Sequence, residues 1–259
     1  MKRAEILQAL QATMQAYIQQ QWPQLLSEVA AELIEQADRA SSTHDARVMF
    51  DARATWLAFD TELHSAWLVH LQRLLDRSLV TAFRRERRRF NQAPRHNLSL
   101  RDLADVEQEL ALERRIANFR SEAGTTLSNL NARIANLYHQ TESAERENPF
   151  RPYVICGSLA LGISELDLLE DVSEVLQKAA ANRLSTRVID LYQQLNAQLE
   201  SFGIPVKLPA QGRSRSEKKS SKSRALQPID SPTVTATIPT ALAAQASQLP
   251  RSDLLLRWI

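Results

Sequence analysis

The densest group of charged side chains in the sequence is an arginine cluster around residue 86. It comprises five arginines and one glutamate in succession: Arg84, Arg85, Glu86, Arg87, Arg88 and Arg89. Guanidinium groups bind carboxylates and phosphates through paired hydrogen bonds, so this density of arginine is typical of an anion site. The ligand would be nucleic acid, a nucleotide second messenger or an acidic protein. The competing interpretation is a solvated helix end, because the helix dipole favours arginine near a carboxyl terminus.

Acidic residues later in the chain form a counterpart to the arginine cluster. No basic residue lies among them, and they are Glu165, Asp167, Glu170, Asp171 and Glu174. Pairing between the two groups would neutralise the arginines, whereas unpaired arginines would be available to a ligand. Dedicated nucleic-acid binding is not favoured, because the sequence shows no helix-turn-helix spacing, zinc-finger ligands or aromatic RNA-binding signature.

The other reactive side chains do not form a catalytic or metal-binding pattern. Asp60 and His64 share a helix face, but two groups do not make a metal site. The single cysteine, Cys156, lies in an apolar segment. That setting is typical of a small buried hydrophobe, and one cysteine excludes an intrachain disulfide. We therefore expect no enzyme activity, no metal and no cofactor.

Helices must position these groups, because the sequence has helical periodicity and few breakers. No Gly or Pro occurs between Pro23 and Pro94. Apolar residues at steps of three and four predict one very long helix from Thr43 to Phe90, ending in the arginine cluster. At 1.5 Å per residue it would be roughly 70 Å long. The predicted fold is therefore all-α, an elongated multi-helix bundle followed by a disordered tail.

Local signals refine this long helix. Ser42 with Asp45 three residues later predicts an amino-terminal cap. Trp56, Phe59 and Trp67 are expected to anchor the core, because aromatic side chains bury the most area.

Shorter helices are predicted on both sides of it. One ends near residue 21 and another restarts at Pro23 and continues to Ala40. Gly124 lies within a later helix, where we expect it to permit a close helix crossing. Gly203 and Pro205 predict the end of the last helix. The later helices are expected at about 102–140, 152–162, 165–182 and 185–202.

Composition changes abruptly after residue 208. The sequence predicts a helical domain over 1–208, a disordered basic, Ser- and Pro-rich linker over 209–250 and an apolar segment over 251–259. The linker's basic residues predict a solvated spacer or a nonspecific polyanion contact, and they are Arg213, Arg215, Lys218, Lys219, Lys222 and Arg224.

The last segment is too apolar for an ordinary tail. It predicts a docking peptide that occupies a groove on its own bundle or on a partner. The alternative is sequence with no selected role. The residues concerned are Leu254, Leu255, Leu256, Trp258 and Ile259.

Net charge and hydropathy give only a default expectation for the cellular location of the chain. The formal net charge is +2, which predicts no partner by itself. The first residues lack the apolar region of a signal peptide, and no apolar run approaches the ~18 residues of a membrane span. We therefore expect a cytoplasmic protein.

The chain carries three sets of motifs in this order: Phe50-Asp51-Ala52, Leu98-Ser99-Leu100, and Asn148-Pro149-Phe150 with Leu166-Asp167-Leu168 and Leu191-Tyr192-Gln193-Gln194-Leu195-Asn196. Together they resemble those of a proteobacterial family catalogued as Domain of Unknown Function 1631. The similarity covers roughly residues 25–204, and it implies a helical, bacterial, cytoplasmic protein of uncharacterised activity. Members are much longer, so this chain resembles a short form. Some members are labelled thymidine phosphorylases, but the chain has no glycine-rich phosphate cradle.

Two functional hypotheses follow from the sequence. The leading one is a non-enzymatic helical regulatory or scaffold module that binds a protein partner. The alternative is an anion-binding module, for nucleic acid or a nucleotide second messenger, that uses the cluster from Arg84 to Arg89.

Overall fold

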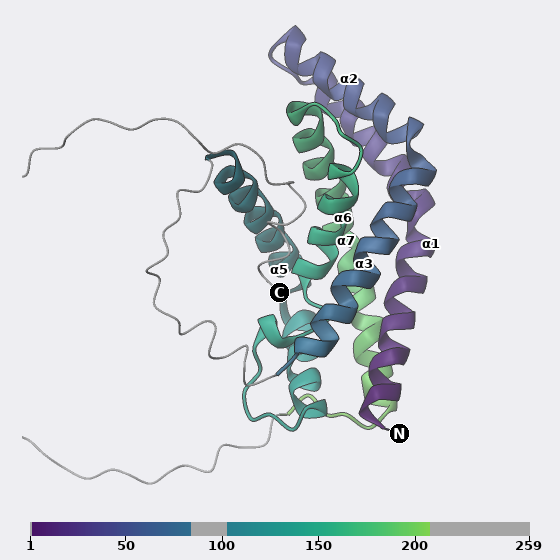
Figure 1. Ribbon diagram of the computed structural model, residues 1–259, viewed down its shortest axis with the longest axis vertical. Coiled ribbons are helices and arrows are strands. Elements are labelled where there is room, and N and C mark those ends of the chain that lie inside the picture. The colour runs from purple at the N-terminus through teal and green to yellow at the C-terminus, as the bar shows by residue number, and fades with distance from the viewer. Residues whose placement is uncertain (1, 84–102, 208–259) are drawn as a thin grey trace, which may run out of the picture.

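A computed structural model describes residues 2–83 and 103–207, and within these ranges all of the regular secondary structure is helical. The multi-helix architecture predicted from the sequence is confirmed. Figure 1 shows most of the helices side by side along one long axis. They are α1 (Arg3–Asp38), α2 (Thr43–Ala58), α3 (Asp60–Thr81), α5 (Leu103–Leu137), α6 (Pro152–Ser164) and α7 (Glu170–Ser201), with a 3-10 turn at Glu145–Glu147.

Helix α6 lies at the centre of the bundle, against α3, α5 and α7. It is apolar on nearly every side, and a helix with that composition is stable only when it is covered all round. Gly162 permits its close approach to α3, because a Cβ atom at this position would lie 3.1 Å from the backbone nitrogen of Trp67. The indole of Trp67 donates a hydrogen bond to Ser158 Oγ of α6, 3.0 Å away.

Polar contacts fix α1 against α7 along their length. Arg183 pairs with Glu32, and Arg187 pairs with Glu28. The hydroxyl of Tyr17 donates to the Arg187 carbonyl at 2.7 Å. These bonds set the register between two helices that both exceed thirty residues.

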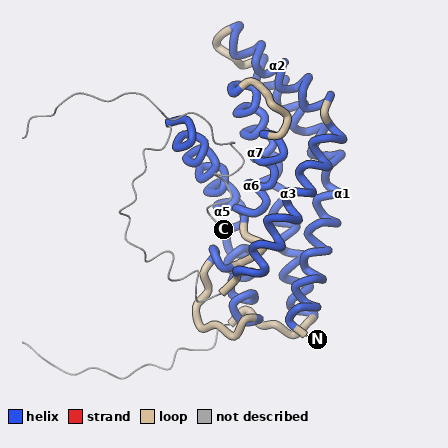
Figure 2. The backbone as a smooth tube through the Cα atoms, in the orientation of Figure 1, coloured by secondary structure: helices blue, strands red, loops and turns tan. Residues whose placement is uncertain are grey.

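The single long helix predicted from Thr43 to Phe90 is wrong. The chain leaves helical geometry at Phe59, where φ is −103° and ψ is 26°, and α3 ends at Thr81. Trp56 and Trp67 are buried as predicted, but Phe59 is 39% exposed and does not anchor the core. Figure 2 shows the described chain as helices joined by loops.

Aromatic packing explains the break at Phe59. The rings of Trp56 and Trp67 lie 5.4 and 5.7 Å from the Trp22 ring of α1. In one straight helix their Cα atoms would be about 16 Å apart, which is too far for both rings to contact one indole. The bend therefore brings two tryptophans onto a third.

Two other predicted boundaries are also wrong. Helix α1 continues through Pro23, because burial on both sides of the proline stabilises the helix by more than the ~3 kcal/mol that the proline costs. Helix α7 spans the predicted gap between 182 and 185, where Leu184 and Ser185 are buried.

The glycine and cap predictions have mixed outcomes. Gly124 bends α5 at φ 41°, and no atom would lie within 4 Å of an added Cβ, so it makes no close crossing. Gly203 ends α7 as predicted, with φ 76°. Ser42 Oγ accepts the Asp45 N–H at 3.0 Å, which confirms the predicted cap.

Candidate functional site

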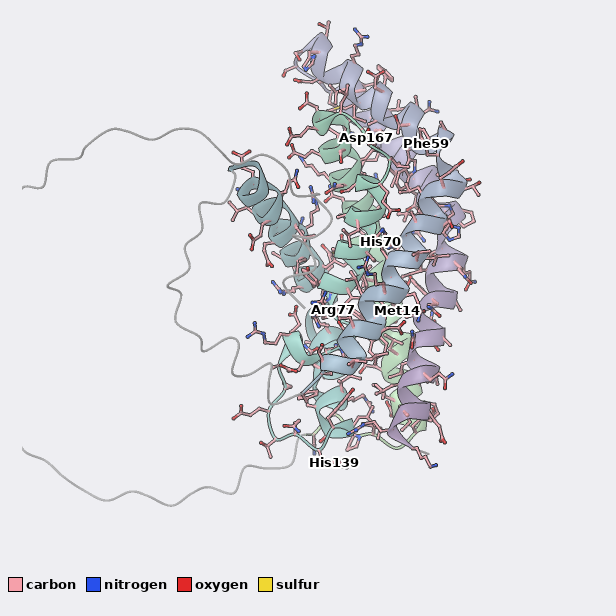
Figure 3. The ribbon with its side chains drawn as sticks, viewed as in Figure 1. Met14, Phe59, His70, Arg77, His139 and Asp167 are labelled. Atoms are coloured by element: carbon pink, nitrogen blue, oxygen red, sulfur yellow. The ribbon has the colours of Figure 1, made fainter. Side chains whose placement is uncertain are left out.

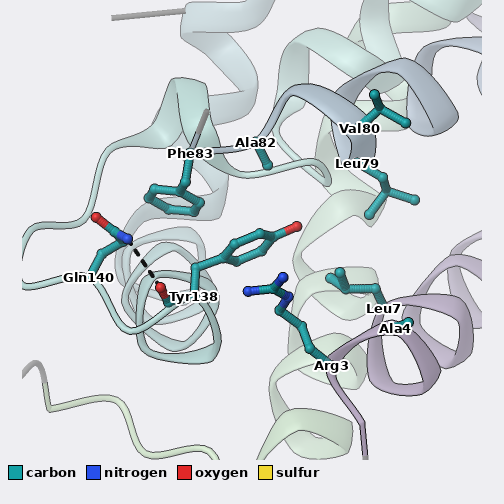
Figure 4. A pocket seen from close by; sticks show the side chains of 9 residues that line it. All are labelled: Arg3, Ala4, Leu7, Leu79, Val80, Ala82, Phe83, Tyr138 and Gln140. Atoms are coloured by element: carbon teal, nitrogen blue, oxygen red, sulfur yellow. Dashed lines mark hydrogen bonds between the residues drawn. The ribbon is translucent and has the colours of Figure 1, made fainter. Parts of the chain in front are cut away.

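A hollow of about 680 Å³ opens at the end of the bundle where the amino terminus of α1 meets the ends of α3 and α5. Figure 4 shows the side chains converging from three segments that are far apart in the sequence. Its lining mixes apolar side chains with polar groups, and one guanidinium group lies across it. The lining residues are Arg3, Ala4, Leu7, Leu79, Val80, Ala82, Phe83, Tyr138 and Gln140.

The wall from α3 is built by a sharp exit from the helix. Phe83 has a φ of 55°, which a side chain such as phenylalanine rarely adopts without support. The support comes from Glu147, whose Oε2 accepts the Phe83 N–H at 2.6 Å. The Phe83 ring packs on Tyr138, with ring centroids 4.8 Å apart. This geometry places residue 83, directly before the arginine cluster, in the hollow.

The wall from α5 is fixed by a two-bond helix end. His139 has a φ of 57°, the Gln140 N–H donates to the Ala135 carbonyl, and the His139 N–H donates to the Asn136 carbonyl, each at 2.9 Å. This bond pattern normally uses glycine at the left-handed position. The Gln140 side chain also donates to the Tyr138 carbonyl, which closes the turn beside the hollow (Figure 4).

Behind the hollow lies a buried polar turn that includes the Asn148-Pro149-Phe150 motif. Asn148 donates from Nδ2 to Asn131 Oδ1 at 2.8 Å, and its Oδ1 accepts the Phe150 N–H at 2.9 Å. The buried Arg151 donates to the Asn148 carbonyl at 3.3 Å. A motif that the sequence singles out therefore has a structural role here, since it fixes the chain between α5 and α6.

The electrostatics of the hollow depend on Arg3 and Tyr138. The Arg3 guanidinium stacks over the Tyr138 ring, 4.7 Å from its centroid. Burial raises the pKa of Tyr138 while the Arg3 charge opposes that rise, so the phenol is neutral at physiological pH. Within the described ranges no carboxylate pairs with Arg3. The hollow can therefore take a ligand that is apolar with one anionic group.

The arginine cluster itself, Arg84, Arg85, Arg87, Arg88 and Arg89, lies outside the described residues. The chain enters it from Phe83. The acidic residues lie toward the other end of α3, as the positions of Asp167 and His139 in Figure 3 indicate. Glu165 Oε1 lies within hydrogen-bond distance of His70 Nε2, at 2.8 Å. Asp171 and Glu174 line a small hollow beside His44 of α2. Pairing of the cluster with these acids stays a prediction.

A second surface of interest is the outer face of α2. Phe50, Ala54 and Leu57 are exposed at steps of four and three, so they share one face of the helix. Phe50 is 49% and Leu57 is 41% exposed, while Ala52 and Trp56 on the opposite face are buried. The exposed stripe is therefore separate from the face that attaches α2 to the bundle.

The remaining candidate groups serve the core. Cys156 is buried, and burial raises its pKa far above the ordinary value, which makes it unreactive. His64 stacks on Trp22 at 4.9 Å, and burial lowers its pKa, with Asp60 opposing that effect. Trp22 donates to Asp60 at 2.6 Å, so the shared face predicted for Asp60 and His64 belongs to a tryptophan contact.

Within 2–83 and 103–207 no group of His, Cys, Asp and Glu is arranged to hold a metal ion. In the same ranges no helix combines the length and apolar character needed to cross a bilayer. The candidate docking residues Leu254, Leu255, Leu256, Trp258 and Ile259 lie outside the part that the structure describes.

The sequence did not predict the hollow, and there is a physical reason for this. Phe83 and Tyr138 read as core positions by periodicity, and Arg3 has no distinguishing neighbour in the sequence. Only the turns at residues 83 and 139, both with non-glycine residues at positive φ, bring the three together. No simple spacing signal would have indicated them.

Comparison with known proteins gives one match. Neither the curated proteins nor the solved structures that were searched yield a match. One family model, described as "Protein of unknown function (DUF1631) N-terminal domain", matches residues 2–203 and so covers all six described helices. This match confirms the similarity that the ordered motifs predicted. On that basis the chain belongs to the DUF1631 family, in the part that the family model calls its N-terminal domain.

Proposed function

We propose that the chain is a non-enzymatic helical scaffold or regulatory module that binds a protein partner through α2. The apolar outer face of α2, formed by Phe50, Ala54 and Leu57, carries this proposal. The partner element is an amphipathic helix of another protein, because the ridges that side chains form at steps of three and four fit into the grooves of a second helix. A cytoplasmic location belongs to the same proposal.

This proposal is supported because the packing of α2 on the bundle does not explain the exposed apolar stripe. Helix α2 attaches to α1 and α7 through the face that carries Ala52 and Trp56. Single exposed apolar residues are common on protein surfaces, whereas several on one face of a helix support the proposal of an interaction surface. Arg47 and Asp51 form an ion pair beside the stripe, which gives it the polar rim typical of interfaces.

The test uses the intact chain as bait with cells of its natural source. Phe50→Asp with Leu57→Asp disrupts the stripe, and Val69→Asp places one such charge on another exposed apolar residue, 63% exposed on α3. The captured protein is then purified, and its affinity is measured by calorimetry. We expect the stripe variant to bind at least about tenfold more weakly than the intact chain, and the control to bind within about twofold of it.

Two results would contradict the proposal. One is equal binding by the stripe variant and the Val69→Asp control. The other is that no purified candidate binds the intact chain. Circular dichroism of each variant shows whether helical content is retained, so that unfolding is not mistaken for lost binding.

A second candidate function is anion binding by the cluster from Arg84 to Arg89. The observation that favours it concerns the surroundings of Phe83, the last described residue before the cluster. There Arg3 has a guanidinium without a carboxylate partner in the described ranges, directly beside the entry to the cluster.

This candidate is tested with a DNA duplex and a cyclic dinucleotide as probes in rising salt. Replacing Arg84, Arg85, Arg87, Arg88 and Arg89 by alanine is expected to abolish binding, and duplex affinity should fall steeply with salt concentration. Absence of binding even at low salt would exclude the candidate.

A further inference from the structure

We propose that the hollow at the end of the bundle binds the chain's own apolar segment, residues 254–259, with Asp253 placed against Arg3. This inference is independent of the α2 surface and of the partner proposed for it. It assigns an occupant to the hollow and makes that end of the bundle a self-docking site.

The apolar part of the wall supplies the first argument. Val80 is 56% exposed at the hollow although it is a large aliphatic side chain, and Leu79 and Phe83 are only half-buried beside it. A volume of about 680 Å³ lies within the range of sites that enclose small ligands or several side chains. Leu254, Leu255 and Trp258 supply apolar groups of the kind that would cover this wall.

Charge supplies the second argument. The Arg3 guanidinium is held over Tyr138, and no carboxylate of the described ranges pairs with it (Figure 4). An occupant that brings one carboxylate next to apolar side chains satisfies both parts of the hollow. Asp253 directly precedes Leu254, so this segment has that combination.

The position of the chain's exit supplies the third argument. Asn136 Nδ2 donates to the carbonyls of Pro205 and Lys207, at 2.7 and 2.9 Å. Asn136 lies in the last turn of α5, so the last described residues leave the bundle at the same end as the hollow. The stretch 208–253 could extend to about 150 Å, which means that its length does not prevent docking. A tethered segment also competes at an effective concentration that a separate peptide rarely reaches.

Crosslinking of the full chain tests the proposal. Ser252→Cys is combined with Val80→Cys at the hollow or, as a matched control, with Val69→Cys on the same helix but away from it. Cys156 is buried and stays reduced in both. On mild oxidation we expect at least about fivefold more intramolecular disulfide with Val80→Cys than with Val69→Cys.

Charge reversal in the crosslinking pair separates specific docking from random collision. Arg3→Glu and Asp253→Arg should each lower the Val80→Cys yield to the control level, and the two together should restore it. Equal yields at positions 80 and 69 would overturn the proposal, as would a yield that Arg3→Glu leaves unchanged. Disulfides that form only between chains, at a rate that rises with protein concentration, would also overturn it. Circular dichroism of each variant confirms that the bundle is intact.

Discussion

Helices α6 and α2 are similar in length, at 13 and 16 residues, but the bundle covers them very differently. Nearly every residue of α6 is buried, whereas α2 buries only Ala52 and Trp56. Packing therefore accounts for the sequence of α6 almost completely. It leaves the apolar outer face of α2 unexplained, which makes α2 the better candidate for an interaction surface.

The largest expected effect removes the main contact of α6. Trp67→Ala leaves a cavity between α3 and α6 and takes away the donor to Ser158 Oγ. The free energy of unfolding should fall by about 3–5 kcal/mol, as for other buried tryptophans. Chemical denaturation measures it, and a loss below about 1 kcal/mol would show that α6 is not the packing centre.

A smaller effect distinguishes the two glycines of α6. Gly162→Ala places a methyl group 3.1 Å from the Trp67 backbone, and Gly157→Ala places one 3.7 Å from a Leu74 methyl. We expect Gly162→Ala to lower the free energy of unfolding by about 1–3 kcal/mol. Gly157→Ala should be neutral or stabilising by up to about 1 kcal/mol, because alanine favours a helix interior. Equal effects in denaturant melts would contradict the close crossing at Gly162.

Acid should affect the α2 side of the bundle through His64. Burial holds the pKa of His64 below its usual 6.5, so the unfolded chain binds more protons than the folded chain between the two values. The contribution of neutral His64 is present above about pH 6.5 and is lost as the pH falls toward the folded-state pKa. His64→Gln should flatten this part of the stability profile.

The smallest expected effect lies on the outer face of α2. Phe50→Ala removes a side chain that is 49% exposed and contributes little to the core, so the free energy of unfolding should change by no more than about 0.5 kcal/mol. The same variant should weaken binding of the proposed partner helix. A loss of stability comparable to that of a buried phenylalanine, found in thermal melts, would show that the stripe belongs to the fold.

Local chemistry predicted much of the architecture but not the places where distant segments meet. The burial of Trp56 and Trp67, the Ser42 cap and the helix end at Gly203 all follow from residues close in sequence. The break at Phe59 depends on a ring that comes from Trp22, and no periodicity within 43–90 contains that information.

The candidate sites divide along the same line. The stripe of Phe50 and Leu57 could have been found from the sequence if one turn of α2 had been assigned to solvent. The hollow could not, because Arg3, Phe83 and Tyr138 come from three segments joined only by tertiary contacts. Residues that are buried by a neighbour in sequence are predictable; residues that meet at a bundle end are not.

The shared end of the bundle has a practical consequence for handling the protein. Arg3 lines the hollow and Lys207 lies at the same end of the bundle, so an affinity tag or surface attachment close to Arg3 would crowd the hollow. The turn at Ser41 and Ser42 joins α1 to α2 at the opposite end and is exposed to solvent (Figure 1). Immobilisation through that turn would present the hollow outward, and a biosensor built in this orientation would report on ligands at the hollow without steric interference.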